Sequence, residues 1–311
     1  MFFRNTNAPS GKELWISLLL FLPVFAAGLF FFNFLASLVA LPLFDWEISR
    51  VLTAITSPQH SDRLGLLVVQ GIISFGSFLI VPFWFMKRID ADKELLPRIL
   101  HNMKQPTPAM AWIAAVATVI FSAPLIAWTV KWNEAWQFPA FLAEFEAWAK
   151  EKEEELKQLT LFLTNFQSPL ELLLGFVVIA IIPGIGEEWL FRGFLQQRLA
   201  QLTGNQHVAI WIAAILFSAF HLQFYGFVPR AILGVVFGYL FALSGNLAVP
   251  MLAHFFNNAY TVSLMYAYKQ NITDFDIENT PEVPPLMAGA SALIVIGILL
   301  WLHHQRIRLN R

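Results

Sequence analysis

Long apolar runs are the feature that most constrains how this chain folds. A helix needs roughly 20 apolar residues to cross about 30 Å of hydrocarbon, and in a bilayer only helices or closed barrels satisfy every backbone polar group. Eight runs are candidate spans, near residues 14–40, 64–86, 109–130, 169–190, 207–222, 227–244, 247–268 and 285–302. We therefore predict an all-α fold, a polytopic transmembrane helical bundle of about eight spans.

The composition agrees with a membrane location and excludes several functions. Of the 311 residues, 57% are hydrophobic and only 13% are charged, which is more apolar surface than a soluble domain of this size hides. The net charge of −1 leaves no basic excess for phosphates, so no nucleic-acid partner is expected. Without cysteine, the chain has no disulfides, thiolate metal ligands or cysteine nucleophiles.

Loop charges predict the orientation of the spans. With a cytoplasmic N-terminus, 12 of the 20 Lys and Arg residues fall in inside segments. Short cytoplasmic loops carry an excess of these residues, so we expect both termini to be cytoplasmic. The expected location is a prokaryotic inner or plasma membrane, with membrane lipid as the surroundings of a multi-pass protein.

The connection 131–168 is the longest one between predicted spans. Its first half has aromatic and leucine side chains at helical spacing, and the charged run 150–157 follows. This pattern predicts an amphipathic helix that lies on the membrane or projects from it. Two interpretations stay open, a solvated helix that joins two spans and a helix that guides substrate.

Two adjacent carboxylates and an arginine lie at the end of the fourth apolar run. Charged groups within a span are costly and are functional candidates by default. Glu188 and Arg192 are four residues apart, which places them on one helical face where they can pair. Glu187 is turned about 100° away and lacks that partner. Two different roles for the two acids follow. The neighbouring glycines Gly184, Gly186 and Gly193 indicate close helix packing, with substrate entry as the alternative.

Histidines in the next spans are predicted to meet this helix. Glu187 lies 17 residues before Gly204, where a turn is expected, and His221 lies 17 residues after it. In an antiparallel helical hairpin these distances place Glu187 and His221 at the same depth. His254 and Asn258 are four residues apart on one face of a later span. Because polar groups in lipid require partners, we expect the set to converge.

Three short motifs made of these residues resemble those of a known family. Glu187, Glu188 and Arg192 form EExxxR, Phe217 and His221 form FxxxH, and His254 and Asn258 form HxxxN. In this order they resemble the CPBP family, which contains type II CAAX prenyl endopeptidases and bacterial proteins of bacteriocin processing and self-immunity. The resemblance covers about residues 169–268. It divides the chain into N-terminal spans 1–168, a catalytic core 169–268, and an exposed loop with the last span, 269–311.

The resemblance implies an intramembrane endopeptidase that acts on a membrane-anchored or lipidated substrate, including a prenylated CAAX-like one. Glu187 would be the general base and His221 would position the water, while His254 and Asn258 would donate to the oxygen of the tetrahedral intermediate. Glu188 and Arg192 would be a supporting pair, and Phe217 would form a wall beneath His221. No cofactor is required for this reaction.

Other functions remain open at this point. Glu187, His221 and His254 are candidate zinc ligands, and the family has been labelled metalloprotease, although HExxH is absent. The chain has no GxSxG-type nucleophile and no Asp within an apolar span, which argues against serine and aspartyl proteases. A non-catalytic alternative is a membrane binding, immunity or scaffold protein. Substitution of Glu187 separates these classes.

Overall fold

The computed structural model describes residues 9–56, 62–275 and 282–309. Throughout these ranges the chain is helical with short connections and forms no strand, which confirms the all-α prediction. The α-helices are α1 Gly11–Ala40, α2 Ile48–Thr56, α3 Arg63–Phe75, α4 Val81–Arg88, α5 Leu95–Lys104, α6 Ala109–Glu134, α7 Ala143–Thr164, α8 Pro169–Gly175, α9 Ile182–Glu188, α10 Gln196–Thr203, α11 Gln206–Phe220, α12 Phe227–Ser244, α13 Ala248–Lys269 and α14 Pro285–Leu309. Short 3₁₀ segments cover Leu41–Phe44 and Ala140–Leu142, and π-helical segments cover Gly76–Ile80, Phe176–Ile181 and Trp189–Leu195.

Six helical stretches of the described chain are long and apolar enough to cross a membrane. They are Gly11–Phe44, Arg63–Arg88, Ala109–Glu134, Pro169–Thr203, Phe227–Ser244 and Pro285–Arg306. The remaining two predicted spans are helical as well. α11 has 15 residues, about 22 Å at 1.5 Å per residue, and α13 has 22 residues with several polar side chains. A polytopic helical bundle is therefore confirmed, while the number of spans stays a prediction.

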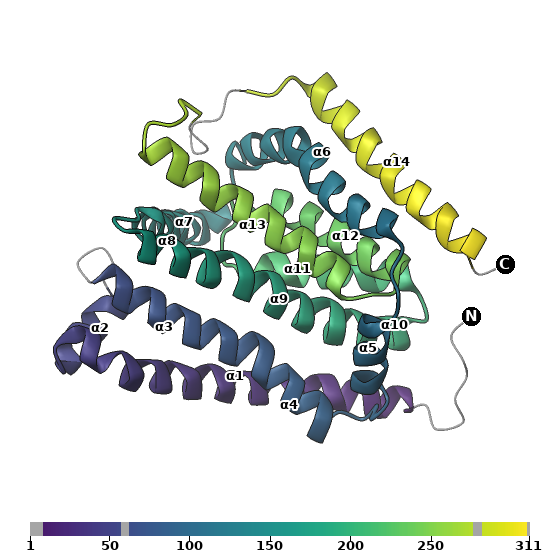
Figure 1. Cartoon of the computed structure of the whole chain (residues 1–311), viewed down its shortest axis with the longest axis horizontal. Helices are drawn as coiled ribbons and strands as arrows, with labels where there is room; N and C mark the ends of the chain where they lie inside the picture. The colour runs from purple at the N-terminus through teal and green to yellow at the C-terminus, as the bar shows by residue number, and fades with distance from the viewer. Residues whose placement is uncertain (1–8, 57–61, 276–281, 310–311) are drawn as a thin grey trace.

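The helices lie in successive layers that run across Figure 1. α1 and the stretch α3 to α4 form one side, the long helix from α8 to α10 follows, and α13 packs against it. α6 and α14 cover the far side, while α11 and α12 lie behind α13 and contact each other, and α12 also contacts α6. The helix from α8 to α10 is therefore at the centre of the molecule, with other helices on both sides.

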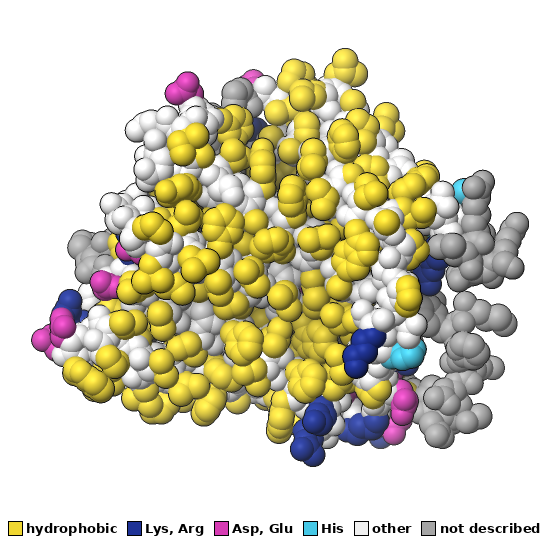
Figure 2. Space-filling view, in the orientation of Figure 1, with side chains coloured by type: hydrophobic (Ala, Val, Ile, Leu, Met, Phe, Trp, Pro, Cys, Tyr) yellow, Lys and Arg dark blue, Asp and Glu magenta, His cyan; other side chains and the backbone are white. Residues whose placement is uncertain are grey.

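The surface has the distribution of apolar and charged side chains that is typical of a protein in a bilayer. Figure 2 shows hydrophobic side chains over the middle of the visible face and charged ones at its margins, with Lys and Arg gathered where α4 ends and α5 lies. The start of α1 and the end of α14 lie at that same end of the bundle (Figure 1). Several apolar helices with a lipid-facing belt make this an integral multi-pass membrane protein. The cytoplasmic location of the termini stays a prediction.

A phenylalanine-rich core fixes the central helix from one side. The Phe194 ring lies 4.7 Å from that of Phe21 on α1 and 5.5 Å from that of Phe85 on α4, centroid to centroid. Aromatic pairs in such tilted and edge-on arrangements add about 0.5–1.5 kcal/mol each beyond their buried area. The first two spans thus hold the segment just beyond Glu188 and Arg192.

The long connection is helical, as predicted, and packs on the bundle. The rings of Phe145 and Trp148 on α7 lie 5.0 and 5.6 Å from the ring of Phe224, in the connection between α11 and α12. In the third predicted part of the chain, 269–311, the last span is a helix, whereas residues 276–281 of its exposed loop lie outside the described residues.

Candidate active site

The helix that carries the acid pair is irregular on both sides of it. α9, with Glu187 and Glu188, lies between the π-helical segments Phe176–Ile181 and Trp189–Leu195. Such insertions within helices are frequent at functional sites. Pro183 has no N–H to offer the Ile179 carbonyl four residues earlier. That carbonyl accepts a hydrogen bond of 3.3 Å from Asn258 Nδ2, which ties α13 to this helix.

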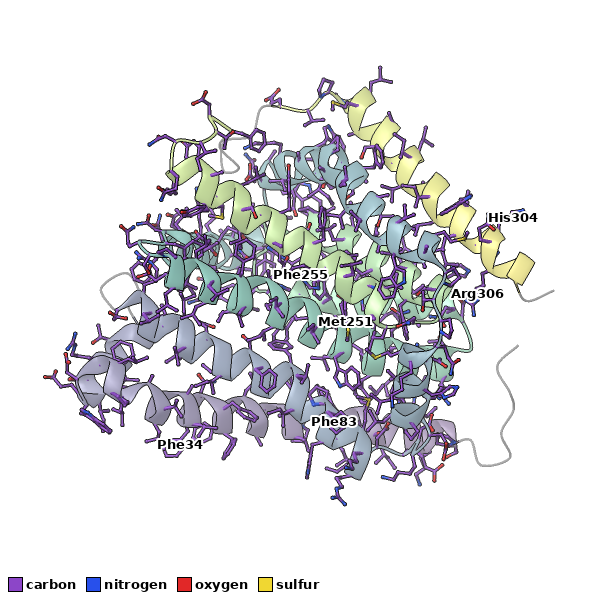
Figure 3. All side chains as sticks on the ribbon, viewed as in Figure 1. Phe34, Phe83, Met251, Phe255, His304 and Arg306 are labelled. Carbon is purple, nitrogen blue, oxygen red and sulfur yellow. The ribbon has the colours of Figure 1, made fainter. Side chains whose placement is uncertain are left out.

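Close packing joins α9 to α13 where Figure 3 labels Met251 and Phe255. A Cβ on Gly184 would lie 2.8 Å from the backbone nitrogen of Phe255 and 2.9 Å from its Cα. Only glycine permits this approach, because backbone atoms cannot move aside as a flexible side chain does. For Gly184 the structure therefore favours the packing interpretation, and the approach brings His254 beside the acid pair.

Glu188 and Arg192 form the expected pair, fully buried. Arg192 Nη1 donates to Glu188 Oε1 at 2.7 Å, and Nη2 donates to the Gly234 carbonyl at 2.8 Å. The guanidinium lies over the Phe217 ring, 4.8 Å from its centroid. Glu188 Oε1 also lies 2.8 Å from Nδ1 of His254. The pair thus fixes one histidine of the site directly.

Glu187, unlike Glu188, has a carboxylate oxygen without a hydrogen-bond partner among the described residues. Its Oε2 lies 3.9 Å from Nε2 of His221 and 3.9 Å from Nε2 of His254. The same oxygen is buried and has no hydrogen-bond partner among the described residues. A water at a normal hydrogen-bond distance of about 2.8 Å from each atom bridges gaps of this size. The structure thus brings Glu187, His221 and His254 together at distances that one water molecule spans.

The hydrogen bonds of the two histidines define which nitrogen faces Glu187. His221 Nδ1 lies 2.8 Å from the Phe217 carbonyl, which only accepts, so Nδ1 carries the proton. His254 Nδ1 faces a carboxylate that already accepts from Arg192, so it donates as well. In the neutral forms both Nε2 atoms therefore present a lone pair. His254 donates from Nε2 only as an imidazolium, a condition that the motif alone did not reveal.

The end of α11 positions His221. The next residue, Leu222, has a φ of 55°, in the left-handed region that a leucine rarely adopts. Such strain persists where surrounding contacts enforce it, often beside active sites. The Phe217 ring contacts both imidazoles edge-on, with centroids 5.0 Å from His221 and 5.8 Å from His254. Phe217 forms the expected wall.

A cavity of about 540 Å³ joins these side chains. Its walls include Glu187, Phe217, His221, His254 and Asn258. Glu188 and Arg192 are fully buried and contribute no atoms to the walls, in keeping with a supporting place. Asn258 Oδ1 accepts from Asn257 Nδ2 at 3.1 Å, and one N–H of Asn258 Nδ2 has no assigned partner in the described structure.

Sequence reasoning missed Arg230, which also lines this cavity. The sequence does hold a signal, because an arginine at the start of an apolar run is a functional candidate.

Sequence reasoning also missed Glu153 of α7, which accepts from Gln223 Nε2 at 3.2 Å and from the Tyr225 N–H at 3.1 Å. Burial raises the pKa of the Glu153 carboxyl above its ordinary value, against the effect of these hydrogen bonds. α7 therefore holds the connection that follows His221.

The described residues contain no group of side chains already arranged as a zinc site. Zinc binds nitrogen and oxygen ligands at about 2.0–2.2 Å, usually four of them in a tetrahedron. Within residues 9–56, 62–275 and 282–309, no group of three His, Asp or Glu side chains is arranged to hold a metal ion. The zinc alternative for Glu187, His221 and His254 therefore stays a prediction that a chelator experiment tests.

Comparisons with known proteins point to one family. Residues 169–260 match the family model of the Rce1-like type II CAAX prenyl endopeptidases, a family of proteases. The chain is 30% identical over 87 residues to the "Uncharacterized protein YpbD" of Bacillus subtilis (strain 168). These aligned residues cover 27% of this chain and 41% of that relative. The match thus spans less than half of the relative's length. No solved structure matches the chain. All seven predicted site residues lie inside the matched segment, and residues 169–260 are thus similar to the Rce1-like type II CAAX prenyl endopeptidases, which is consistent with the CPBP family.

Proposed function

We propose that this protein is an intramembrane endopeptidase that hydrolyses a peptide bond of a membrane-anchored substrate with water activated by Glu187. The observation that carries the proposal is the position of Glu187 Oε2, buried, unpaired among the described residues and 3.9 Å from two imidazole Nε2 atoms. A general base must lie within hydrogen-bond reach of the proton it abstracts, and a water that bridges these three atoms would place its own proton there.

The water would donate its two protons to Glu187 Oε2 and His221 Nε2. Its free lone pair then points away from both and toward a substrate carbonyl carbon in the cavity. As the new C–O bond forms, Glu187 takes the proton, and the π electrons of the carbonyl move to its oxygen. When the intermediate collapses, the C–N bond breaks and Glu187 returns the proton to the leaving nitrogen.

The negative oxygen of the intermediate requires donors at this moment. Asn258 would supply the N–H of Nδ2 that is not bonded to Ile179, and His254 would supply Nε2–H as an imidazolium. The imidazolium would lie between two carboxylates, those of Glu188 and Glu187, which share its charge. Removal of one such donor costs roughly 2.7–4 kcal/mol in hydrolases.

The decisive experiment replaces Glu187 with Gln, which preserves shape and removes the base. We expect reconstituted wild-type protein to cleave members of a pool of N-palmitoylated peptides, and Glu187→Gln to lose about 10²–10⁴-fold in rate. Glu94→Gln, at an exposed position away from the cavity, is the matched control and should retain full activity. Undiminished cleavage by Glu187→Gln would refute the assignment.

Two further arms separate the alternatives. We expect a zinc chelator to leave cleavage unchanged, whereas a loss that added zinc restores would establish the metal-dependent variant. Wild-type protein that binds the anchored peptides and cleaves none of them would favour the binding or scaffold role.

A further inference from the structure

A polar pocket lies at the end of the bundle where α5 and α14 end. It has a volume of about 300 Å³ and is formed by the connection from α5 to α6, the turn between α12 and α13, and the last turns of α14. Arg306 is among its wall residues, whereas no Asp or Glu of the described chain is. The pocket shares no residue with the cavity around Glu187. It is therefore a separate hollow with a cationic wall.

Arg306 has hydrogen-bond donors that the protein leaves unused. Figure 3 labels this residue near the end of α14, where its Nη1 donates to the neutral carbonyl of Ala242. Nη2 and Nε have no partner among the described residues, and no carboxylate of these residues lies within 4.0 Å. The side-chain amides of Asn102 and Gln305 line the same pocket and also make no hydrogen bond within the described structure. A guanidinium fork with amide donors beside it matches the oxygens of a phosphate.

An apolar groove of about 410 Å³ follows this pocket along the seam between α6 and α14. Ile294 and Trp301 line the groove, and Gln305 of the polar pocket lies one turn beyond Trp301 on the same helical face. Gly297 keeps the groove open, since nothing lies within 4 Å of a Cβ built there. From Ile294 to Arg306 α14 rises about 18 Å at 1.5 Å per residue, close to half of the ~30 Å of hydrocarbon in a bilayer. Groove and pocket together therefore have roughly the depth of one leaflet.

We propose that the pocket and the groove together bind one anionic phospholipid, with its phosphate at Arg306 and an acyl chain between α6 and α14. A lipid fits better than a soluble anion, because the polar pocket adjoins an apolar groove along the same two helices. An anionic headgroup fits because no acid lines the pocket and because Lys and Arg side chains gather at this end of the bundle (Figure 2). This lipid site is independent of the proposed peptidase chemistry.

Native mass spectrometry of the full-length protein tests the lipid site without a cleavage assay. The protein in detergent is titrated with phosphatidylglycerol or phosphatidylcholine of identical acyl chains, and the dissociation constant of the first bound lipid is measured. We expect phosphatidylglycerol to bind about 5-fold more tightly, the preference that one basic side chain near the membrane surface gives to an anionic lipid. Glycerophosphoglycerol, the same headgroup without acyl chains, should not displace the lipid at equal concentration.

Two substitutions with matched controls test the two halves of the site. Arg306→Gln should abolish the preference for phosphatidylglycerol, whereas Arg88→Gln, an exposed arginine outside the pocket wall, should leave it intact. Gly297→Leu should weaken the binding of both lipids about 10-fold, because the added side chain overpacks the occupied groove. Gly289→Leu should leave binding unchanged, since Gly289 lies on α14 outside the groove and nothing is within 4 Å of its Cβ.

The lipid preference distinguishes recognition from a structural role. If Arg306 only holds the end of α14 at Ala242, Arg306→Gln weakens both lipids equally and the preference survives, which overturns the proposal. Equal binding of the two lipids to wild type overturns it too, and so does an equal loss of preference in Arg88→Gln, which would indicate the general charge of this end. Wild-type affinity in Gly297→Leu, or displacement by glycerophosphoglycerol, would contradict an acyl chain in the groove. Arg306 and Gly297 are both exposed, so neither substitution changes the core.

Discussion

Glu187 and Glu188 are neighbours in sequence with different partners, so substitutions at the two positions have different consequences. Glu188 is bound by Arg192 and His254 in a fully buried cluster, whereas Glu187 lines the cavity. Loss of Glu187 removes a chemical group from the cavity. Loss of a partner of Glu188 instead leaves the Glu188 charge uncompensated in the protein interior, which lowers the free energy of unfolding.

Arg192→Met tests this distinction. We expect it to destabilise the protein by about 3–5 kcal/mol, because Glu188 remains buried without its partner. Thermal unfolding in detergent measures the loss. Glu188→Gln combined with Arg192→Met should recover part of the stability, since both charges are then absent. A single variant as stable as wild type would contradict the structural role of the pair.

The residues of the site were predictable from the sequence because helical spacing and equal distances from a turn determine which side chains meet. Glu187, His221 and His254 converge as the pattern indicates. The protonated nitrogen of each imidazole was not predictable, since it depends on the Phe217 carbonyl and the Glu188 carboxylate across the fold. Arg230 was counted only as a loop charge, because its place in the cavity depends on how α12 begins.

At the scale of helices, the contact between α9 and α13 is the one on which the site geometry depends. It joins the helix of Glu187 to the helix of His254 and Asn258, through backbone contact at Gly184 and the Asn258 hydrogen bond to Ile179. The apolar runs predicted both helices. The π-helical segments escaped prediction, because one extra residue in a turn hardly changes the hydrophobic pattern.

Gly184→Ala should therefore separate two helices. We expect a loss of about 1–3 kcal/mol in stability, the usual cost of overpacking, together with reduced peptide cleavage. Gly289→Ala is the matched control on α14, where nothing lies within 4 Å of the added Cβ. Comparison of unfolding temperatures and cleavage rates for the two variants checks the prediction. Equal behaviour of both would show that α9 and α13 tolerate a wider spacing.

For the whole molecule, a polar cluster at the end of the bundle near α5 joins the first spans to the central helix. Arg198 of α10 pairs with Asp90 and lies 3.4 Å from Asp92, and Ser17 of α1 donates to Asp90 at 2.5 Å. Gln201 and Arg98 complete it, with donor distances to Asp92 of 3.0 and 3.2 Å. Nothing in the hydropathy pattern predicts that these loop acids meet Arg198, since it lies 108 residues from Asp90 and 106 from Asp92.

Asp92 makes this junction sensitive to acid. Burial alone would raise its pKa, but the hydrogen bond from Gln201 and the charges of Arg198 and Arg98 outweigh burial and hold the pKa below the ordinary 3.8. A lowered folded-state pKa means that the stabilisation is present above pH 3.8 and is lost as pH falls through the folded value. We expect Asp92→Asn to lower the unfolding temperature at pH 6, and this difference from wild type to shrink below pH 3.8. A difference that is constant with pH would contradict it.

The length of α11 has a consequence for the cell. A helix of 15 residues is about 22 Å long, shorter than a layer of about 30 Å, and α7 packs on the connection that follows His221 at its end. On the other side of His221 the space is filled by packed aromatic rings such as Phe191 and Phe217. Water for the proposed hydrolysis would then enter from one compartment while ions find no continuous path to the other, and we expect such a protein to leave the electrical resistance of its membrane intact.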